Sequence, residues 1–397
     1  MKDSLASTRL TVFLIVLLDV MGLGLIIPAQ PFLAKSFGAS AATVTQLGTV
    51  YSLMQFILSP VWGALSDRFG RRPILLMTLS VTLCGHVAFA LSSTLTLLFV
   101  ARALTGVGAA NISTAQAVLS DTHPPQERSR AMALIGAAFG LGFVLGPAIG
   151  GVLFHFDYRA PAALAAALAA GNIALVLSSV RETRREAAVG APGNRHSLAS
   201  FLRAEGALQQ LVLTTLCMMT SFALMEQSVG LFIESVWVAP GEANSMEKAT
   251  ALTSAFLVVV GISAVIVQGF LVRRWLVSKS ESFLLRCGLL VIAASLVLIP
   301  CLGSVGSFPL FLTSGALLAL GSGLFNPSML GLISLACPAD RQGVGLAINQ
   351  SAAAMGRILG PLFAGALFSR GSALPFLAGS VLACLALGMS WRVKATR

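Results

Sequence analysis

The feature that most constrains this chain is a series of long apolar stretches separated by short polar loops. Of its 397 residues, 56% are hydrophobic and only 10% are charged, whereas soluble domains carry about 25% charged residues. A helix needs about 20 apolar residues to cross a bilayer. This rule predicts membrane spans at 10–34, 43–66, 74–93, 95–119, 131–154, 160–180, 207–236, 250–272, 283–303, 307–332, 342–369 and 372–391. We therefore expect an all-α, polytopic membrane protein with twelve transmembrane helices.

The positions of the basic residues predict how the spans are oriented. If the N-terminus is inside, the outer segments hold only Lys35, Arg159, Lys248 and Arg370. Because Lys and Arg are enriched in cytoplasmic loops, both termini are predicted to be cytoplasmic. The long polar stretch 181–206 is interpreted as a basic cytoplasmic linker between two six-helix halves, 1–180 and 207–397. The net charge of +11 lies in clusters between apolar spans, which argues against nucleic acid as a partner.

Two sequence echoes relate the halves to each other. GFVLGPAIGGVLF (Gly142–Phe154) returns as GRILGPLFAGALF (Gly356–Phe368). GVGAAN (Gly106–Asn111) returns as GSGLFN (Gly321–Asn326), at nearly the same offset. Repeated halves are what many transporters use to build a binding site near the middle of the membrane. The echoes therefore predict two pseudo-symmetric halves.

Three more motifs lie in the first half. The loop between spans two and three reads GALSDRFGRRP (Gly63–Pro73). In that loop Asp67 is placed to pair with the arginines and with a helix N-terminus, where the dipole favours an anion. Gly63 is expected to allow close packing of the second helix, and Gly70 a tight turn. Span four contains LFVARALTGVGAA, and span one contains LLDVMGLGLIIPAQPF.

Together with the span-five sequence GFVLGPAIGG, these motifs resemble the major facilitator superfamily, and specifically its twelve-span drug:proton antiporters. The resemblance implies a conformational latch made of Gly63, Asp67, Arg68, Gly70, Arg71 and Arg72. It also implies an antiporter motif made of Gly142, Gly146, Pro147, Gly150 and Gly151. Thr105 replaces a glutamine of the family. Gly85 and His86 stand where tetracycline exporters carry an aspartate, which argues against tetracycline as the substrate.

Ionisable side chains inside a membrane are expensive, so they are candidates for function. Asp19 in span one and Glu226 in span seven are the predicted proton-coupling acids. The resemblance implies that Arg102 in span four takes part in the coupling, and we expect it to be the partner of Asp19. For Asp19 a purely structural pairing stays open, as does snorkelling for Arg102. His86 is either packed or functional. The predicted substrate contacts are polar or adaptable apolar side chains near mid-membrane: Gln55, Asn111, Asn349, Met218 and Phe222.

The sequence thus predicts a proton-coupled antiporter, and not an enzyme, that exports small amphipathic or hydrophobic compounds from a bacterial cytoplasm. It contains no Walker A sequence, H-E-x-x-H motif or Cys/His cluster, so neither a cofactor nor a metal is expected. The expected partners are a small-molecule substrate, protons and the lipid of the inner membrane, and the expected state is a monomer. The alternatives are a dedicated exporter of one metabolite such as a siderophore or sugar, an importer, and a non-transporting receptor.

Overall fold

The computed structural model describes residues 2–109, 114–115, 118, 125–180, 182, 206–239, 241–242, 244–267, 279–336 and 342–391. Within these ranges the chain is helical. The helices are α1 (Lys2–Ile26), α2 (Gln30–Ser36), α3 (Ala41–Phe69), α4 (Arg71–Ala90), α5 (Leu95–Gly108), α7 (Pro125–Phe154), α8 (Ala160–Ser179), α10 (Ala207–Trp237), α11 (Ser245–Ile266), α13 (Glu281–Ser304), α14 (Phe308–Ala336), α15 (Gln342–Arg370) and α16 (Leu374–Ser390).

All of these helices except α2 correspond to predicted membrane spans. Among the described residues, eight helices are long and apolar enough to cross a membrane by length and composition. The apolar parts of α5, α7 and α16 are shorter, and part of the predicted span that contains α5 lies outside the described residues. The prediction of an all-helical membrane protein is confirmed.

The first predicted span differs from the structure at its end. The prediction continued one helix to residue 34, but α1 ends at Ile26 and a turn precedes the short helix α2. Pro28 lies in this turn and Pro31 lies in the first turn of α2. Proline has no backbone N–H to continue a helix, whereas its fixed φ suits a helix start. The two prolines therefore divide the segment into two helices.

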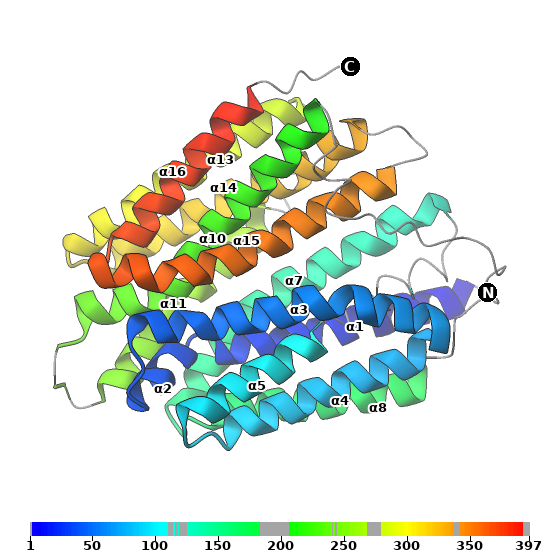
Figure 1. Cartoon of the computed structure of the whole chain (residues 1–397), viewed down its shortest axis with the longest axis horizontal. Coiled ribbons are helices and arrows are strands. Elements are labelled where there is room, and N and C mark those ends of the chain that lie inside the picture. Colours follow the sequence, from blue (N-terminus) through cyan, green and yellow to red (C-terminus); the bar gives the residue numbers. More distant parts are fainter. Residues whose placement is uncertain are drawn as a thin grey trace. The chain divides into compact units, whose positions relative to one another are not determined.

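Two compact units organise the chain, and each repeats one scheme of helix packing. The first unit comprises residues 1–189 and 243–258, and the second comprises 190–242 and 259–397. In the first unit α1 packs against α7 and α8, while α4 packs against α5 and α8. In the second unit α10 packs against α15 and α16, while α13 packs against α14 and α16. Figure 1 shows the long helices of each unit running side by side.

Glycines bring α1 and α7 into close contact. A Cβ atom placed on Gly146 would lie 2.7 Å from the Cα atom of Gly24, and one on Gly142 would lie 2.8 Å from the Val20 side chain. Gly150 faces the backbone carbonyl of Leu25 in the same way. The glycines are four residues apart on one face of α7, so they let the two backbones approach each other.

The equivalent contact in the second unit lies between α10 and α15. A Cβ atom on Gly356 would lie 2.8 Å from the backbone nitrogen of Thr220, and Gly360 faces Ala223. Gly356 and Gly360 belong to the second copy of the repeated sequence. Both copies therefore serve the same purpose, which is to seat a helix against the first long helix of its unit.

We expect Gly146→Ala to destabilise the protein by about 1–3 kcal/mol, because the added methyl group overpacks the α1–α7 contact. Gly140→Ala is the matched control, since its Cβ would meet no described atom within 4 Å and alanine is the better helix former. Thermal unfolding of the purified variants would measure both effects. Equal unfolding temperatures for the two variants would contradict the packing role of Gly146.

Candidate functional site

A carboxylate from a segment after α8 lies at the N-terminus of α4, beside the junction between α3 and α4. Gly70 precedes the helix with a φ of 106°, in a region that side chains rarely adopt. The backbone N–H groups of Arg71 and Arg72 donate hydrogen bonds of 2.8 and 3.2 Å to the carboxylate of Glu182. Helix N-termini have unpaired N–H groups and favour negative charge. Glu182 thus caps α4 from a segment that follows α8.

The two arginine side chains extend this network to neighbouring helices. The guanidinium of Arg71 donates to the hydroxyl of Ser66 at 2.8 Å, and that of Arg72 donates to the carbonyl of Leu177 at 2.8 Å. The ends of α3, α4 and α8 are therefore joined by hydrogen bonds, most of them with a charged partner. Such bonds are stronger than neutral ones.

The other predicted latch residues take different positions. Arg68 is exposed, with its guanidinium 5.2 Å from the centre of the Phe69 ring. The side chain of Asp67 lies outside the described residues. A Cβ atom on Gly63 would meet no described atom within 4 Å, and the close packing expected at this glycine stays a prediction. Sequence reasoning missed Glu182, although an acidic residue just after an apolar span was a signal for it.

Arg102 lies in the interior of the first unit with 4% of its surface exposed. Its guanidinium is 4.8 Å from the centre of the Tyr51 ring on α3, which is within the range of a cation–π contact. The nearby Gln55 donates a hydrogen bond of 3.2 Å from its side-chain amide to the carbonyl of Ala109. Both contacts join α3 to the α5 segment.

Thr105 also explains part of the packing around Arg102. Its hydroxyl donates to the carbonyls of Ala101 and Arg102 in its own helix, at 3.0 and 3.1 Å. It therefore does not reach across to another helix, as a longer glutamine could. A Cβ atom on Gly85 would lie 2.8 Å from the backbone nitrogen of Thr105. The small residue on α4 thus lets α5 lie against it.

His86 fills the space beside a glycine of α1. Its side chain is 3% exposed, and its Nε2 atom would lie 3.2 Å from a Cβ atom on Gly22. Among the described residues its Nδ1 atom has no hydrogen-bond partner. Asp19 precedes Gly22 by three positions on α1 and is half-buried. The pairing of Asp19 with Arg102 stays a prediction.

The candidate residues of the second unit lie on α10 and α15. Glu226 and Phe222 are half-buried, and Met218 is buried. Asn349 is 5% exposed, and its amide oxygen accepts a 2.6 Å hydrogen bond from the hydroxyl of Thr215. The structure thus occupies the oxygen of Asn349 with a bond between helices. Asn111, the remaining predicted substrate contact, lies outside the described residues.

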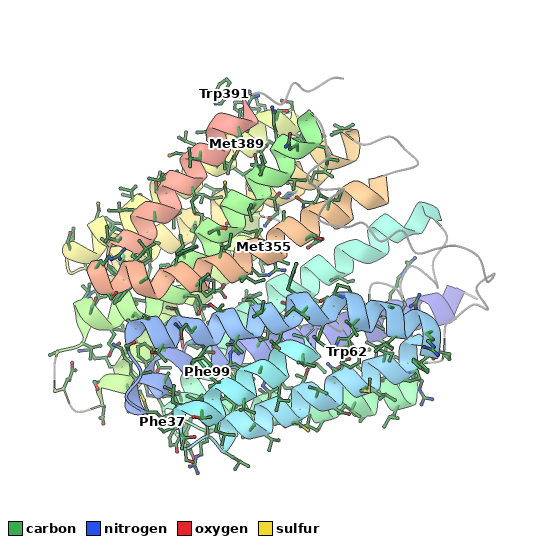
Figure 2. All side chains as sticks on the ribbon, in the orientation of Figure 1. Phe37, Trp62, Phe99, Met355, Met389 and Trp391 are labelled. Carbon is green, nitrogen blue, oxygen red and sulfur yellow. The ribbon has the colours of Figure 1, made fainter. Side chains whose placement is uncertain are left out.

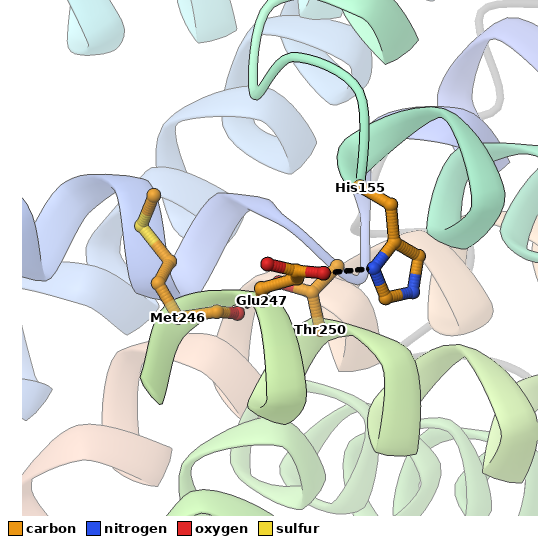
Figure 3. Close-up of polar contacts among 4 residues, drawn as sticks. All are labelled: His155, Met246, Glu247 and Thr250. Carbon is orange, nitrogen blue, oxygen red and sulfur yellow. Dashed lines mark hydrogen bonds and ion pairs between the residues drawn. The ribbon is translucent and has the colours of Figure 1, made fainter. Parts of the chain in front are cut away.

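The antiporter motif continues into a contact with α11 inside the first unit. Gly151 lies directly against the side chain of Ser254, where a Cβ atom would overlap it. His155 directly follows the last residue of α7, and its Nδ1 atom contacts the carboxylate of Glu247. The hydroxyl of the buried Thr250 donates to the carbonyl of Met246 at 2.8 Å. Figure 3 shows the contact between His155, at the end of α7, and Glu247 of α11.

A bundle of apolar helices that contains the buried Arg102 and the half-buried carboxylates of Asp19 and Glu226 is typical of a multi-pass membrane transporter. The family model of the Major Facilitator Superfamily matches residues 12–278 and 238–396. The chain therefore belongs to this superfamily, whose fold has twelve spans, and it is a transporter of small molecules rather than an enzyme.

Its curated relatives include drug-resistance proteins. The class B tetracycline resistance protein of Escherichia coli is 28% identical over 92% of this chain and 89% of its own length. The class C protein of the same organism is 30% identical over 89% of this chain and 88% of its own length. Multidrug resistance protein 2 of Bacillus subtilis (strain 168) is 26% identical over 99% of this chain and 98% of its own length.

Solved structures with the same fold are similar over nearly their whole length. The human organic anion transporter MFSD10 (TETRAN) superposes with a TM-score of 0.73 at 22% identity, over 97% of this chain and 99% of that one. A bacterial homolog of the human lysosomal transporter Spinster, inward-facing and occupied, gives a TM-score of 0.76 at 14% identity, over 96% and 95%. At these sequence identities the similarity shows a shared fold alone.

The Glu182 contact can be tested by placing a methyl group in it. We expect Gly70→Ala to lower the unfolding temperature more than Gly38→Ala, because a Cβ at Gly70 would overlap the Glu182 carboxylate. Gly38 also has a positive φ, of 79°, but no described atom lies within 4 Å of its Cβ position, so it reports backbone strain alone. Adding Glu182→Ala to Gly70→Ala removes the overlapping carboxylate, so the unfolding temperature of the double variant should rise part of the way toward that of Gly38→Ala. Identical losses at both glycines would contradict the contact.

Proposed function

We propose that this chain is a proton-coupled antiporter that exports small amphipathic or hydrophobic compounds from the cytoplasm. The observation that carries the proposal is the half-buried carboxylate of Asp19 on the apolar helix α1, the helix on which the glycines of α7 pack. Ionisable groups within membrane spans mark ion and substrate pathways. The printed names of the relatives, tetracycline and multidrug resistance proteins, support export of drug-like molecules.

In this mechanism a proton and a substrate compete for the same site. An ionised Asp19 carries a charge in an apolar helix, and proton binding removes that charge. The buried cation of Arg102 would favour the ionised form of Asp19. Glu226 would be the corresponding proton-binding acid on α10. Antiport then requires only that each conformation releases one of the two ligands before it binds the other.

The network around α4 would work as the conformational latch. The Glu182 carboxylate, the N-terminus of α4 and the side chains of Arg71 and Arg72 form a charged contact between separate helices. Such a contact stabilises the conformation in which it exists and is lost in a conformation in which α8 or the following segment moves. Arg68 and Asp67 belong to the same proposed latch through their position in the motif.

The substrate contacts are proposed from the side chains around these acids. Phe222 lies one turn before Glu226 on the same helix, with Met218 one turn further, so they offer adaptable apolar surface near a carboxylate. Gln55, Asn111 and Asn349 would supply polar groups. Because Gly85 and His86 replace an acidic position of tetracycline exporters, we expect tetracycline itself not to be a substrate.

Substitution of the two acids tests the coupling. In proteoliposomes with an imposed pH gradient, we expect Asp19→Asn to abolish gradient-driven movement of a lipophilic cationic dye such as ethidium, because the proton carrier is gone. Glu226→Gln should reduce it. Glu234→Gln is the matched control, since Glu234 lies near the end of the same helix α10, and it should transport like the wild type.

The outcomes separate the alternatives. Intact coupled transport by Asp19→Asn would remove Asp19 as the proton carrier. If the wild type moved no dye, drug or tetracycline in a broad screen but responded to one metabolite, a dedicated exporter would replace a multidrug exporter. Ligand binding without any flux would favour a receptor.

We further propose that the protein is a monomer in a bacterial inner membrane with both termini cytoplasmic. This orientation follows from the distribution of Lys and Arg. A green fluorescent protein fused after residue 397 should fluoresce, because it folds in the cytoplasm, whereas alkaline phosphatase fused there should be inactive. The reverse result would contradict the proposed orientation.

A further inference from the structure

Helix α13 presents a straight apolar stripe on its outer face. Phe283 is 51% exposed and Leu290 is 59% exposed, and Val297 continues the stripe. The three residues are seven positions apart, which is close to two helical turns, so they lie in one line along the helix. The helix itself is among the most apolar of the described spans. In a membrane such a stripe faces the acyl chains of lipid.

Two cations stand at the N-terminal end of this stripe. The Nζ atom of Lys279 lies 5.9 Å from the centre of the Phe283 ring, and the guanidinium of Arg286 lies 4.3 Å from that of the Trp391 indole. Trp391 follows the last residue of α16 and is 66% exposed; Figure 2 labels it at that end of the helix. We call Lys279, Arg286 and Trp391 the α13–α16 cation site.

Protein groups use little of the hydrogen-bonding capacity of Arg286. An arginine has five N–H donors, four of them on the two Nη nitrogens. One nitrogen, Nη2, donates to the carbonyl of Ser390 at 3.2 Å, and the buried Nε has no partner among the described residues. The cation–π contact and this single bond fix the guanidinium in place, which leaves donors for another acceptor.

The nearby acid does not neutralise this site. Glu281 begins α13, but its side chain lies against α14, where a Cβ atom on Gly331 would be 3.2 Å from its Cγ. Positions 281 and 286 are well apart around a helix, since each residue advances by 100°. Within the described part of the chain, the α13–α16 cation site thus has no carboxylate partner.

We propose that the α13–α16 cation site binds the headgroup of an anionic phospholipid. The phosphate accepts hydrogen bonds from Arg286 and attracts Lys279, while the acyl chains lie along the stripe of Phe283, Leu290 and Val297. The indole of Trp391 occupies the boundary between headgroup and chain, where tryptophan is enriched. A zwitterionic lipid is held less well, because its own cation offsets the phosphate charge. This site goes beyond the proposed transport activity and does not depend on it.

The four tryptophans are Trp62, Trp237, Trp275 and Trp391, and the last can report on a bound lipid. The full-length protein is placed in phosphatidylcholine nanodiscs and titrated with phospholipids that carry bromine near the headgroup end of one acyl chain. Bromine quenches tryptophan fluorescence on contact. The difference between the wild type and Trp391→Phe isolates the signal of Trp391.

We expect brominated phosphatidylglycerol to quench Trp391 at a lower mole fraction than brominated phosphatidylcholine, by about fivefold or more for each cation involved. Arg286→Gln should remove most of this preference. Arg159→Gln is the matched control, because Arg159 also stacks on an aromatic ring, that of Tyr158 at 5.1 Å, but belongs to the first unit. It should keep the preference of the wild type.

Several results would overturn the proposal. Equal quenching by the two lipids would exclude anionic selectivity, and an equal loss in Arg159→Gln would show a general charge effect instead of a site. Absence of quenching by either lipid would mean that protein covers Trp391. If Arg286→Gln is not monodisperse, Lys279→Gln provides the second variant, and a preference unchanged by Lys279→Gln would contradict its part in the site.

Discussion

Close contact between glycine-bearing helix faces is the interaction on which each unit depends. Gly142, Gly146 and Gly150 seat α7 against α1, and Gly356 and Gly360 seat α15 against α10. In a bilayer there is little hydrophobic drive between helices, so van der Waals packing at small residues must supply the association. The same faces determine the position of Asp19 and Glu226, because these acids lie on the two helices that the glycines contact.

The ionisable groups of the first unit occupy two different environments, which suit two proposed tasks. Arg102 and His86 are buried among α1, α3, α4 and α5, where a charge is costly and its partners matter for function. Arg71, Arg72 and Glu182 lie at helix ends, where backbone dipoles and exposed polar groups accommodate charge. The first environment suits proton coupling, and the second suits a contact that forms in one conformation and breaks in another.

Several polar side chains that the sequence motifs single out form hydrogen bonds to other protein groups in the structure. Gln55 bonds to the carbonyl of Ala109, Asn349 to Thr215, and Thr105 to its own helix. Polar residues that join helices are common in membrane proteins because an unsatisfied polar group is costly in hydrocarbon. Mid-membrane polarity alone therefore does not distinguish a substrate contact from a bond between helices.

The sequence by itself determined the helical membrane class, most helix bounds and the superfamily, because apolar length, basic loops and glycine motifs are local signals. It predicted one first span where Pro28 and Pro31 make two helices. Only the tertiary structure decided that Glu182 caps α4, that Thr215 pairs with Asn349, and that Arg286 stacks on Trp391. These partners are more than 100 residues apart in the chain, and no local periodicity encodes which distant side chain will fill a given hydrogen-bonding position.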